Sequence, residues 1–376
     1  MSDLLINGRF LCQPATGVQR VSREFVQALD RLIDKGEYAG LRAMLVAPEG
    51  ADFRSLGVRH IATEHVRGGQ GHFWEQVTLP RRAGRTPLLC LGNIAPLRGL
   101  VGRGRVGVML HDQSFRQFTR DYSLAYRLLH GIIGYFLVRR AHPLITVSHT
   151  EAHAIRAGNG GRPAHIVVAP NGSWMNDEPP SPRPEPGGEG RPYVLHVGGF
   201  SNRKNVEGVF ASARTLAARG IETRLVGKPN AQCDALLADL SDHERRHVHF
   251  TGYVDNDELA RLYREASCLM YPSFYEASGL PPSEAMRFGC PVVTSDLPVL
   301  NERCGDAALY CDPYDAGSIV TRILEIMGDP HLAQDLSQKG QARSNLFSWE
   351  NQARTIMAAM GFVAGAPSRQ PEAQFA

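Results

Sequence analysis

Two glutamates lie eight positions apart in SFYEASGLPPSEAMRFG, Glu276 before a glycine turn and Glu284 after it. CLMYPS is typical of a strand and PPSEAMRFG of a helix, so the turn would join a strand's carboxyl end to a helix start. There the N–H groups of Gly279 and Leu280 would point outward, as phosphate binding requires. A carboxylate accepts hydrogen bonds from a pair of sugar or ribose hydroxyls. Alone, Glu276 fits a solvated loop acid and Glu284 a favourable helix-start charge, but together they predict a sugar-phosphate site.

A second candidate group is the pair Arg203 and Lys204 in GGFSNRKN, between the expected strand YVLHV and a predicted helix. Cations are unfavourable at a helix start, so a negative ligand should compensate them. A diphosphate at the same strand edge would do so. The alternative is an exposed basic loop, which is less expected in a chain with only four lysines.

The segments around these residues alternate between strands and helices in both halves of the chain. LLING, LRAMLVA, TPLLCLGN, RVGVMLHD and LITVSH are apolar runs bounded by turn residues, as buried parallel strands are. YVLHVGG, ETRLVGK, HVHFTGYV, CLMYPS, PVVTSD and AALYCDP repeat the pattern, with helical segments between them. The alternation predicts an α/β chain of two doubly wound parallel sheets, whose ligands bind at the carboxyl ends of the strands.

Composition places a domain boundary near the middle of the chain. Residues 171–192 contain six prolines and four glycines, which predicts an exposed linker. Two Rossmann-like domains, facing a central cleft, would flank it. A final helix capped by Ser348 would cross back to the first domain, and a disordered tail would follow. The expected segments are the N-terminal domain 1–172, the linker 173–191, the C-terminal domain 192–346, the helix 347–361 and the tail 362–376.

Several classes of protein are disfavoured by the sequence. No apolar run is long enough to span a bilayer, and the N-terminus lacks a basic-then-apolar signal pattern. The seven cysteines are scattered without metal-ligand spacing, as expected for reduced thiols in a cytosolic protein. No basic-aromatic module or helix-turn-helix signal is present, so nucleic acid is not an expected partner.

The charge is distributed unevenly. Residues 1–172 carry 22 Lys and Arg against 12 Asp and Glu, which is +10, and the remainder carries 19 against 26, which is −7. This indicates either an arginine-rich proteome or an N-terminal half that meets an anionic ligand or membrane leaflet. The apolar segment 122–140 is flanked by arginines, and it fits either a core helix or a helix on a membrane surface.

The neighbours of the two glutamates resemble the donor-site signature of retaining GT-B glycosyltransferases, glycosyltransferase family 4. The stretch EASGLPPSE is preceded by YPSFY and followed by EAMRFGCPVVTSD. The resemblance continues in YVLHVGGFSNRKN, in HFTGYVDNDELARLYREASCLMYPS, in MLHDQSF and in the FSWE helix. It covers nearly the whole chain and is strongest from 192 to 350. The spacing of the glutamates alone is a weak pattern, but this order of neighbours is specific.

The resemblance implies a role for each matching residue. Glu284 would bind the nucleotide ribose and Glu276 the hydroxyls of the donor sugar. Arg203 and Lys204, with the amides near Ser278, Gly279 and Leu280, would bind the diphosphate or the sugar. Tyr253 and Val254 would contact the base, and the backbone of Gly17 would contact the phosphates. His111 would contact the donor sugar near the reaction centre. A packed loop histidine is the alternative for His111. Gly199 lies where many relatives carry an arginine, so neutralisation of the donor would depend on Arg203 and Lys204.

A metal is not expected. DND at 255–257 matches a D-x-D metal motif, but it follows a strand and opens DELARLYREA, so Asp255 or Asn256 is a natural helix cap. The resemblance also implies no metal and no cofactor, the nucleotide-sugar being a substrate. Because no carboxylate is evident as a nucleophile, the resemblance favours a same-face retaining mechanism, in which the leaving phosphate helps to deprotonate the acceptor.

The resemblance also narrows the substrates. LLINGRFLCQPATGVQRVSREF and GGFSNRKN are most similar to bacterial polysaccharide transferases that use GDP-mannose, and UDP- and dTDP-sugars remain open. A lipid-linked saccharide is the expected acceptor. The enzyme would be a cytoplasmic hexosyltransferase in peripheral contact with the anionic inner face of the membrane, in exopolysaccharide, O-antigen or lipopolysaccharide assembly. A sugar-nucleotide epimerase is the alternative of another class. A non-catalytic binding subunit should have lost Lys204, Glu276 or Glu284, and no oligomeric state is predicted.

Overall fold

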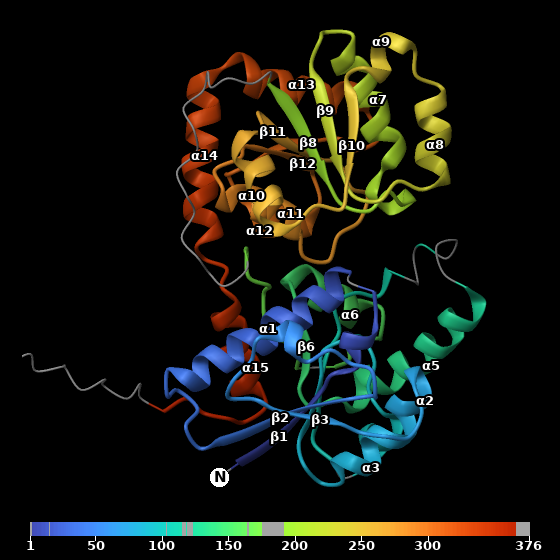
Figure 1. Ribbon diagram of the computed structural model, residues 1–376, viewed down its shortest axis with the longest axis vertical. Coiled ribbons are helices and arrows are strands. Elements are labelled where there is room, and N and C mark those ends of the chain that lie inside the picture. The colour runs from blue at the N-terminus through green and yellow to red at the C-terminus, as the bar shows by residue number, and fades with distance from the viewer. Residues whose placement is uncertain are drawn as a thin grey trace, which may run out of the picture. The chain divides into compact units, whose positions relative to one another are not determined.

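The structure is a computed structural model that describes residues 2–14, 16–102, 104–114, 118, 123–163, 165–174 and 192–365. Residues 175–191 of the expected linker and the end of the expected tail, from 366 on, lie outside the described residues. The chain forms two compact units (Figure 1). Met1–Asn176 with Ser348–Ala376 is called unit 1, and Asp177–Phe347 is called unit 2.

Unit 1 is built on a seven-stranded parallel sheet, counted within the described residues, with the order β3-β2-β1-β4-β5-β6-β7. The strands are β1 (Ser2–Asn7), β2 (Leu41–Ala47), β3 (Ala62–His65), β4 (Leu88–Cys90), β5 (Val106–Met109), β6 (Leu144–Thr146) and β7 (Val167–Val168). The helices are α1 (Gly17–Asp34), α2 (Gly71–Phe73), α3 (Leu79–Ala83), α4 (Leu97–Val101), α5 (Leu124–Arg140), α6 (His149–Ala157) and α15 (Trp349–Ala359). Short 3₁₀ turns cover Arg9–Cys12 and Arg54–Leu56, and a π-helical turn covers Trp74–Thr78.

The strands of unit 1 follow the apolar runs of the sequence. β4 and β5 are buried along their whole length, because helices cover both faces of a parallel sheet. β3 and β7 were not predicted, since β3 is a polar, largely exposed edge strand and β7 is a two-residue pairing. Among the described residues, none of the helices combines the length and the apolar character needed to cross a membrane.

The C-terminal helix α15 packs against α1 within unit 1. Ser348 caps it as predicted, since its hydroxyl accepts a hydrogen bond from the N–H of Asn351. Trp349 is fully buried beside Gly172, where an added Cβ would lie 2.5 Å from the indole ring. Ion pairs of α15 with the end of α1 and its following loop add to this apolar contact: Lys35 with Glu350 at 2.7 Å and Arg354 with Glu37 at 2.7 Å.

Unit 2 repeats the architecture with a six-stranded parallel sheet, again counted within the described residues, in the order β10-β9-β8-β11-β12-β13. The strands are β8 (Tyr193–Val197), β9 (Glu222–Val226), β10 (Val248–Gly252), β11 (Cys268–Tyr271), β12 (Val292–Ser295) and β13 (Leu309–Cys311). The helices are α7 (Val206–Ala217), α8 (Ala231–Ala238), α9 (Asp242–Arg245), α10 (Asn256–Glu265), α11 (Leu280–Arg287), α12 (Pro298–Cys304), α13 (Ala316–Gly328) and α14 (Pro330–Ser344).

The prediction of two doubly wound parallel-sheet domains is confirmed by these two sheets. In unit 2 the chain runs from β8 outward to β9 and β10, and then returns to β11 on the other side of β8. The strand order therefore reverses between β8 and β11, which is where open α/β sheets bind ligands at their carboxyl edge. The corresponding reversal in unit 1 lies between β1 and β4.

Candidate active site

The loops after β8 and β11 bring Lys204 and Glu276 together at the reversal point of unit 2. Lys204 ends a short 3₁₀ turn, Asn202–Lys204, and its ammonium group lies 2.5 Å from Glu276 Oε1. The same group donates to the hydroxyl of Tyr271, the last residue of β11, at 2.7 Å. Both charged side chains are largely buried. The predicted neighbourhood of these two residues is therefore present, although they are far apart in the sequence.

The electrostatic surroundings keep Glu276 ionised. Burial by itself raises the pKa of Glu276, but the charge and hydrogen bond of Lys204, aided by Arg203, hold that pKa below its ordinary value. Burial and the Glu276 carboxylate raise the pKa of Tyr271 far above its ordinary value, so its phenol stays protonated. The site thus presents a carboxylate and an ammonium group that form an ion pair with each other.

Asn205 fixes the loop that carries Lys204, and sequence reasoning did not single it out. Its backbone is left-handed, with φ 57°, and its side-chain oxygen caps α7 by accepting from the N–H of Gly208. Its amide nitrogen donates to the carbonyl oxygens of Pro272 at 3.0 Å and Pro313 at 2.6 Å. One buried asparagine therefore ties the loop after β8 to the loops after β11 and β13. An asparagine at a helix start was the available signal.

The glycine turn has the geometry that the sequence predicted. Gly279 is left-handed, with φ 69°, and an added Cβ would lie 2.8 Å from Leu300, so glycine is required. Pro281 and Pro282 in the first turn of α11 have no N–H group. The N–H groups of Gly279 and Leu280 have no hydrogen-bond partner within the described part of the chain. They remain available for an anion.

Glu284 lies deeper than its predicted role would suggest. It is buried in α11, and its Oε2 accepts a hydrogen bond from the hydroxyl of Tyr263 in α10 at 2.9 Å. Arg303 of α12 is also buried near it, and burial lowers the pKa of this guanidinium to about 9. Sequence reasoning missed both Tyr263 and Arg303, because each is contributed by a different helix.

The other predicted residues of unit 2 lie along the same carboxyl edge. Gly199 is exposed after β8, and Tyr253 is 81% exposed after β10, followed by a half-buried Val254. Arg203 is half-buried, and its carbonyl oxygen accepts from the N–H of Phe274 at 2.9 Å. Ser278 is buried beside Gly279.

Asp255 caps α10 by accepting from the N–H of Glu258 at 2.9 Å, as predicted for a cap. The described residues hold no group of three or more potential metal-ligating side chains, counted over His, Cys, Asp and Glu.

Two predicted residues belong to unit 1. Gly17 is the exposed first residue of α1, and an added Cβ there would meet no other atom within 4 Å. His111 follows β5, is buried, and its Nε2 donates to the carbonyl oxygen of Leu91 at 2.7 Å. Burial lowers the pKa of His111, and a neutral imidazole results.

Comparison with known proteins shows what unit 2 is similar to. Residues 178–343 match the family described as glycosyl transferases group 1. Over 166 residues the chain is 36% identical to O-antigen chain mannosyltransferase B of Escherichia coli, covering 42% of this chain and 43% of that protein. It therefore spans less than half the length of that relative.

Other relatives extend the similarity over both units. O-antigen chain mannosyltransferase RfbU of Salmonella typhimurium is 24% identical over 341 residues, covering 86% of this chain and 90% of that protein. Sucrose-phosphate synthase of Thermosynechococcus elongatus has a TM-score of 0.73 at 20% identity, covering 94% and 96% of the two chains. Anabaena HepE, solved in complex with UDP and glucose, has a TM-score of 0.71 at 16% identity, covering 96% and 99%. The chain thus has the GT-B fold.

Proposed function

We propose that the protein is a retaining glycosyltransferase, which moves mannose from GDP-mannose to a saccharide acceptor in bacterial polysaccharide assembly. The observation that carries the proposal is the Lys204–Glu276 pair at the reversal point of unit 2, where Glu276 is in the same loop as Gly279 and Leu280, whose N–H groups have no partner within the described residues. Mannose is favoured because two of the relatives are O-antigen mannosyltransferases. A UDP-sugar is the alternative donor, since HepE was solved with UDP.

In the proposed complex, each group of the site has a task that its chemistry supports. The carboxylate of Glu276 accepts hydrogen bonds from the donor sugar hydroxyls. Lys204, Arg203 and the N–H groups of Gly279 and Leu280 hold the diphosphate. Because Lys204 contacts Glu276, it is positioned where sugar and diphosphate would meet.

The nucleoside end of the donor would follow the same carboxyl edge. Tyr253 offers an exposed ring to the base beside Val254, and Glu284 binds the ribose in this proposal. Ser278 and Gly199 line the edge between the base and the sugar. In unit 1, Gly17 offers an open backbone to the phosphates, and the neutral imidazole of His111 contacts the sugar in this proposal.

The chemical step would be a same-face substitution. The acceptor hydroxyl oxygen bonds to C1 of the sugar while the bond from C1 to the phosphate oxygen breaks, and the nucleoside diphosphate leaves with the electron pair. The hydroxyl proton passes to that leaving oxygen. Lys204, Arg203 and the helix-start amides stabilise the charge that develops on the diphosphate, which is the role a metal ion has in other transferases. We therefore propose that no metal is needed.

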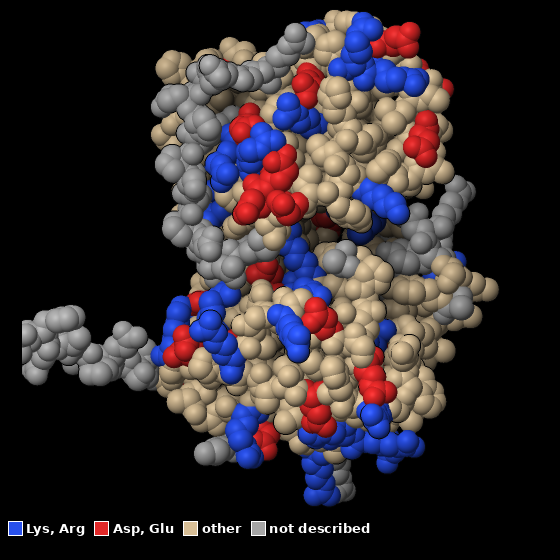
Figure 2. Space-filling model, in the orientation of Figure 1, with Lys and Arg blue, Asp and Glu red and all other residues tan. Residues whose placement is uncertain are grey.

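Helix α5 supports contact with a membrane. Leu124, Leu128, Ile132 and Tyr135 lie on one face of α5, and each is between 51% and 66% exposed. The opposite face is also apolar and is buried in the core of unit 1. A surface helix normally has a polar outer face, so a continuous apolar stripe marks an interaction site. In Figure 2 the surface over α5 is largely uncharged.

An anionic bilayer carrying a lipid-linked acceptor fits this stripe. Arg139 and Arg140 are exposed at the end of α5, where they would meet lipid phosphates. We expect salt-sensitive binding to phosphatidylglycerol vesicles, which Ile132→Asp should weaken about tenfold or more, since a buried isoleucine contributes about 1.5–3 kcal/mol. Leu346→Asp is the control, because Leu346 is 64% exposed in unit 2. Equal vesicle binding by both variants would refute the membrane contact.

The experiment that tests the proposed activity compares donors. Thermal stabilisation and slow hydrolysis are measured with GDP-mannose, UDP-glucose, UDP-N-acetylglucosamine and dTDP-rhamnose, for the wild type and Glu276→Ala. We expect GDP-mannose to stabilise and to be hydrolysed by the wild type, with no hydrolysis by the variant. Hydrolysis of a UDP-sugar in place of GDP-mannose would show that the donor is a UDP-sugar. The proposal would be refuted if none of the four donors, and neither GDP nor UDP, stabilised the protein.

A further inference from the structure

The buried phenol of Tyr271 belongs to the Lys204–Glu276 site and has no task in the reaction proposed above. Tyr271 is the last residue of β11, at the reversal point of the sheet, and its side chain is fully buried. Its hydroxyl accepts a hydrogen bond from the Lys204 ammonium group at 2.7 Å, and the ammonium nitrogen lies 5.0 Å from the centre of the Tyr271 ring. The ammonium group is therefore in contact with both a phenol and the Glu276 carboxylate.

The centre of the sheet fixes the position of Tyr271. Its backbone pairs with Thr294 of β12, whose hydroxyl donates to the Tyr271 carbonyl oxygen at 3.1 Å. Its ring is stacked with the ring of His196 in β8, 6.3 Å away at 26°. The Nδ1 of His196 in turn donates to the carbonyl oxygen of Met270 at 3.0 Å. The phenol is thus a rigid support for Lys204, whose own four-carbon chain is flexible.

The phenol stays neutral beside the carboxylate. Burial, and then the charge of Glu276, raise the pKa of Tyr271 well above its ordinary value. A neutral hydroxyl oxygen can accept a hydrogen bond from an ammonium group without neutralising it, whereas a carboxylate offsets its charge. Contact with Tyr271 therefore restrains Lys204 and leaves its positive charge intact.

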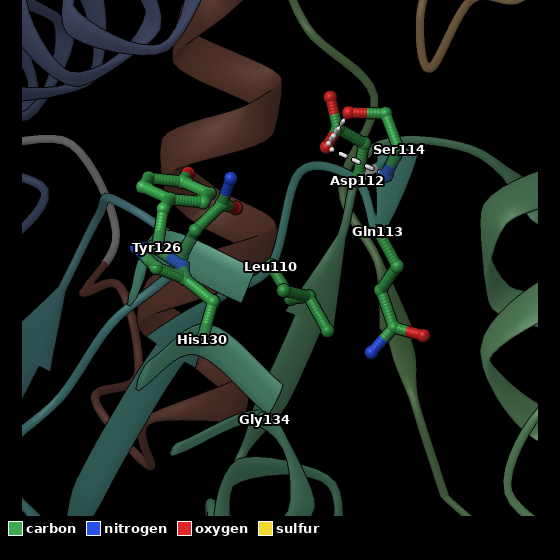
Figure 3. Close-up of a pocket in the computed structure, with 8 residues that line it drawn as sticks. Leu110, Asp112, Gln113, Ser114, Tyr126, His130 and Gly134 are labelled. Carbon is green, nitrogen blue, oxygen red and sulfur yellow. Dashed lines mark hydrogen bonds between the residues drawn. The ribbon is translucent and has the colours of Figure 1, made fainter. Parts of the chain in front are cut away.

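The equivalent place in unit 1 is occupied by a cysteine. β4 has there the place that β11 has in unit 2, and it ends at Cys90, whose sulfur lies 3.8 Å from the amide nitrogen of Asn7. One strand further on, after β5, the Asp112 carboxylate accepts from the N–H and the hydroxyl of Ser114 in its own turn (Figure 3). The topology therefore does not require a tyrosine at the end of this strand, and the phenol of unit 2 has to be explained by the charged side chains around it.

We propose that Tyr271 is a positioning residue, which holds the Lys204 ammonium group in the orientation that the leaving diphosphate requires. This inference rests on the proposed function, because it adds a residue to the same donor site. In the proposed complex the sugar hydroxyls bond to Glu276, so the carboxylate no longer serves Lys204 alone. The bond from Lys204 to Tyr271 does not compete with the sugar, and it continues to limit the motion of the lysine chain. Tyr271 acts through Lys204, because its own side chain is fully buried.

Tyr271→Phe tests this role, since it removes the hydroxyl and keeps the ring. Lys204 stabilises charge that develops as the diphosphate leaves, so the variant should affect the rate more than donor binding. We expect kcat of donor hydrolysis to fall about tenfold, from the loss of a hydrogen bond to a charged group, and KM to change by less than about twofold. An unchanged kcat would overturn the proposal.

Tyr193→Phe is the matched control. Tyr193 in β8 is also buried, and its hydroxyl donates to the carbonyl oxygen of Leu262 at 2.8 Å. Both variants lose one hydroxyl and one hydrogen bond, so their melting temperatures should fall by similar amounts. Only Tyr271→Phe should slow hydrolysis, and an equal loss of kcat in Tyr193→Phe would overturn the positioning role.

A double-mutant cycle tests whether Tyr271 acts through Lys204. In the Lys204→Met background, Tyr271→Phe should have no further effect on kcat, because no ammonium group remains to be held. Effects of the two substitutions that multiply would show that Tyr271 acts independently of Lys204, which contradicts the proposal.

The contact itself is tested without turnover, by NMR of the lysine ammonium groups. The chain has four lysines, so the Lys204 signal is assigned from its absence in Lys204→Met. We expect slow proton exchange of this group in the wild type and in Tyr193→Phe, and about tenfold faster exchange in Tyr271→Phe. Equal exchange in all three would overturn the proposal. A wild type that hydrolyses no donor would refute the proposed function, whereas the exchange rates would still decide whether Tyr271 holds Lys204.

Discussion

The carboxyl edges of the two sheets share a topology and differ in chemistry. In both units the strand order reverses beside the first strand, and a buried ion pair lies there, Arg9–Glu75 at 3.0 Å and Lys204–Glu276 at 2.5 Å. In unit 2 both partners come from loops that directly follow neighbouring strands. In unit 1 the glutamate comes from a π-helical turn and also accepts from the Asn7 amide. The topology therefore determines where a ligand binds, and the loops determine what it can be.

The largest expected effect comes from removing the cation of each buried ion pair, and it should show that the two pairs have different functions. Lys204→Met and Arg9→Met each remove one partner of a buried pair, which should cost about 3–5 kcal/mol of unfolding free energy. Lys204→Met should also slow donor hydrolysis about 100-fold or more, because it removes charge stabilisation from the leaving diphosphate. Arg9→Met should leave GDP binding unchanged. Urea unfolding and calorimetric titration at low temperature test this, and equal effects on GDP binding would remove the distinction between the units.

The next effect concerns a feature that the units share, a buried neutral histidine. Burial lowers the pKa of His196 in β8 to about 4, from an ordinary value of 6.5. Between these values the unfolded chain binds more protons than the folded one, so stability falls as pH drops from 6.5 toward 4. Between pH 7 and pH 5 we expect a loss of about 2 kcal/mol from this residue.

His196→Gln should remove that part of the pH dependence, as measured by urea unfolding at both pH values. His331 is exposed at the start of α14, so His331→Gln is the matched control. An unchanged slope in His196→Gln would mean that His196 is not the group responsible. Burial also lowers the pKa of His130, on α5 of unit 1, to about 4, so the same experiment on His130 would show how far unit 1 contributes to the acid sensitivity.

A third effect tests the glycine turn of unit 2. Gly279 and Gly220 have similar left-handed conformations, φ 69° and φ 72°, but only Gly279 has a neighbour that an added Cβ would strike. Both alanine variants should lose about 1 kcal/mol from backbone strain. Gly279→Ala should lose about 1–3 kcal/mol more, from overpacking against Leu300, and should weaken GDP binding. Thermal melts with and without GDP distinguish the two, and identical ligand shifts would contradict the anion site.

The last prediction is that removing metal ions has no effect on the rate of donor hydrolysis. If the cations and amides of unit 2 replace a metal, EDTA should leave the rate of donor hydrolysis unchanged, and added Mg²⁺ or Mn²⁺ should not raise it. A rate that EDTA abolishes and Mn²⁺ restores would show that Lys204 and Arg203 do not neutralise the diphosphate alone.

The comparison also shows what the sequence could and could not predict. The buried strands β5 and β8 were predictable because a short apolar run bounded by turn residues is typical of a buried strand. The polar edge strand β3 was not, because its pairing depends on β2 and not on its own composition. Lys204 and Glu276 were predicted as neighbours because the carboxyl ends of parallel strands meet at one edge.

The supporting residues were harder to predict, because their roles depend on partners from distant elements. Nothing in the sequence distinguishes Asn205 from the other asparagines, because its role depends on its bonds to Pro272 and Pro313. The apolar composition of α5 fits a core helix or a membrane-surface helix. α5 turned out to be apolar on both faces, one buried and one exposed, so neither interpretation alone described it.

The assignment of α15 to unit 1 has a consequence for the synthesis of the protein. Unit 1 is made from both ends of the chain, and Trp349 fills the space beside Gly172. On the ribosome, every residue of unit 2 therefore emerges before unit 1 can be completed. Domains usually fold in the order in which they are translated. Here the C-terminal unit can finish first, while the first-made sheet waits with an open apolar face, which is the stage at which a nascent chain depends on chaperones.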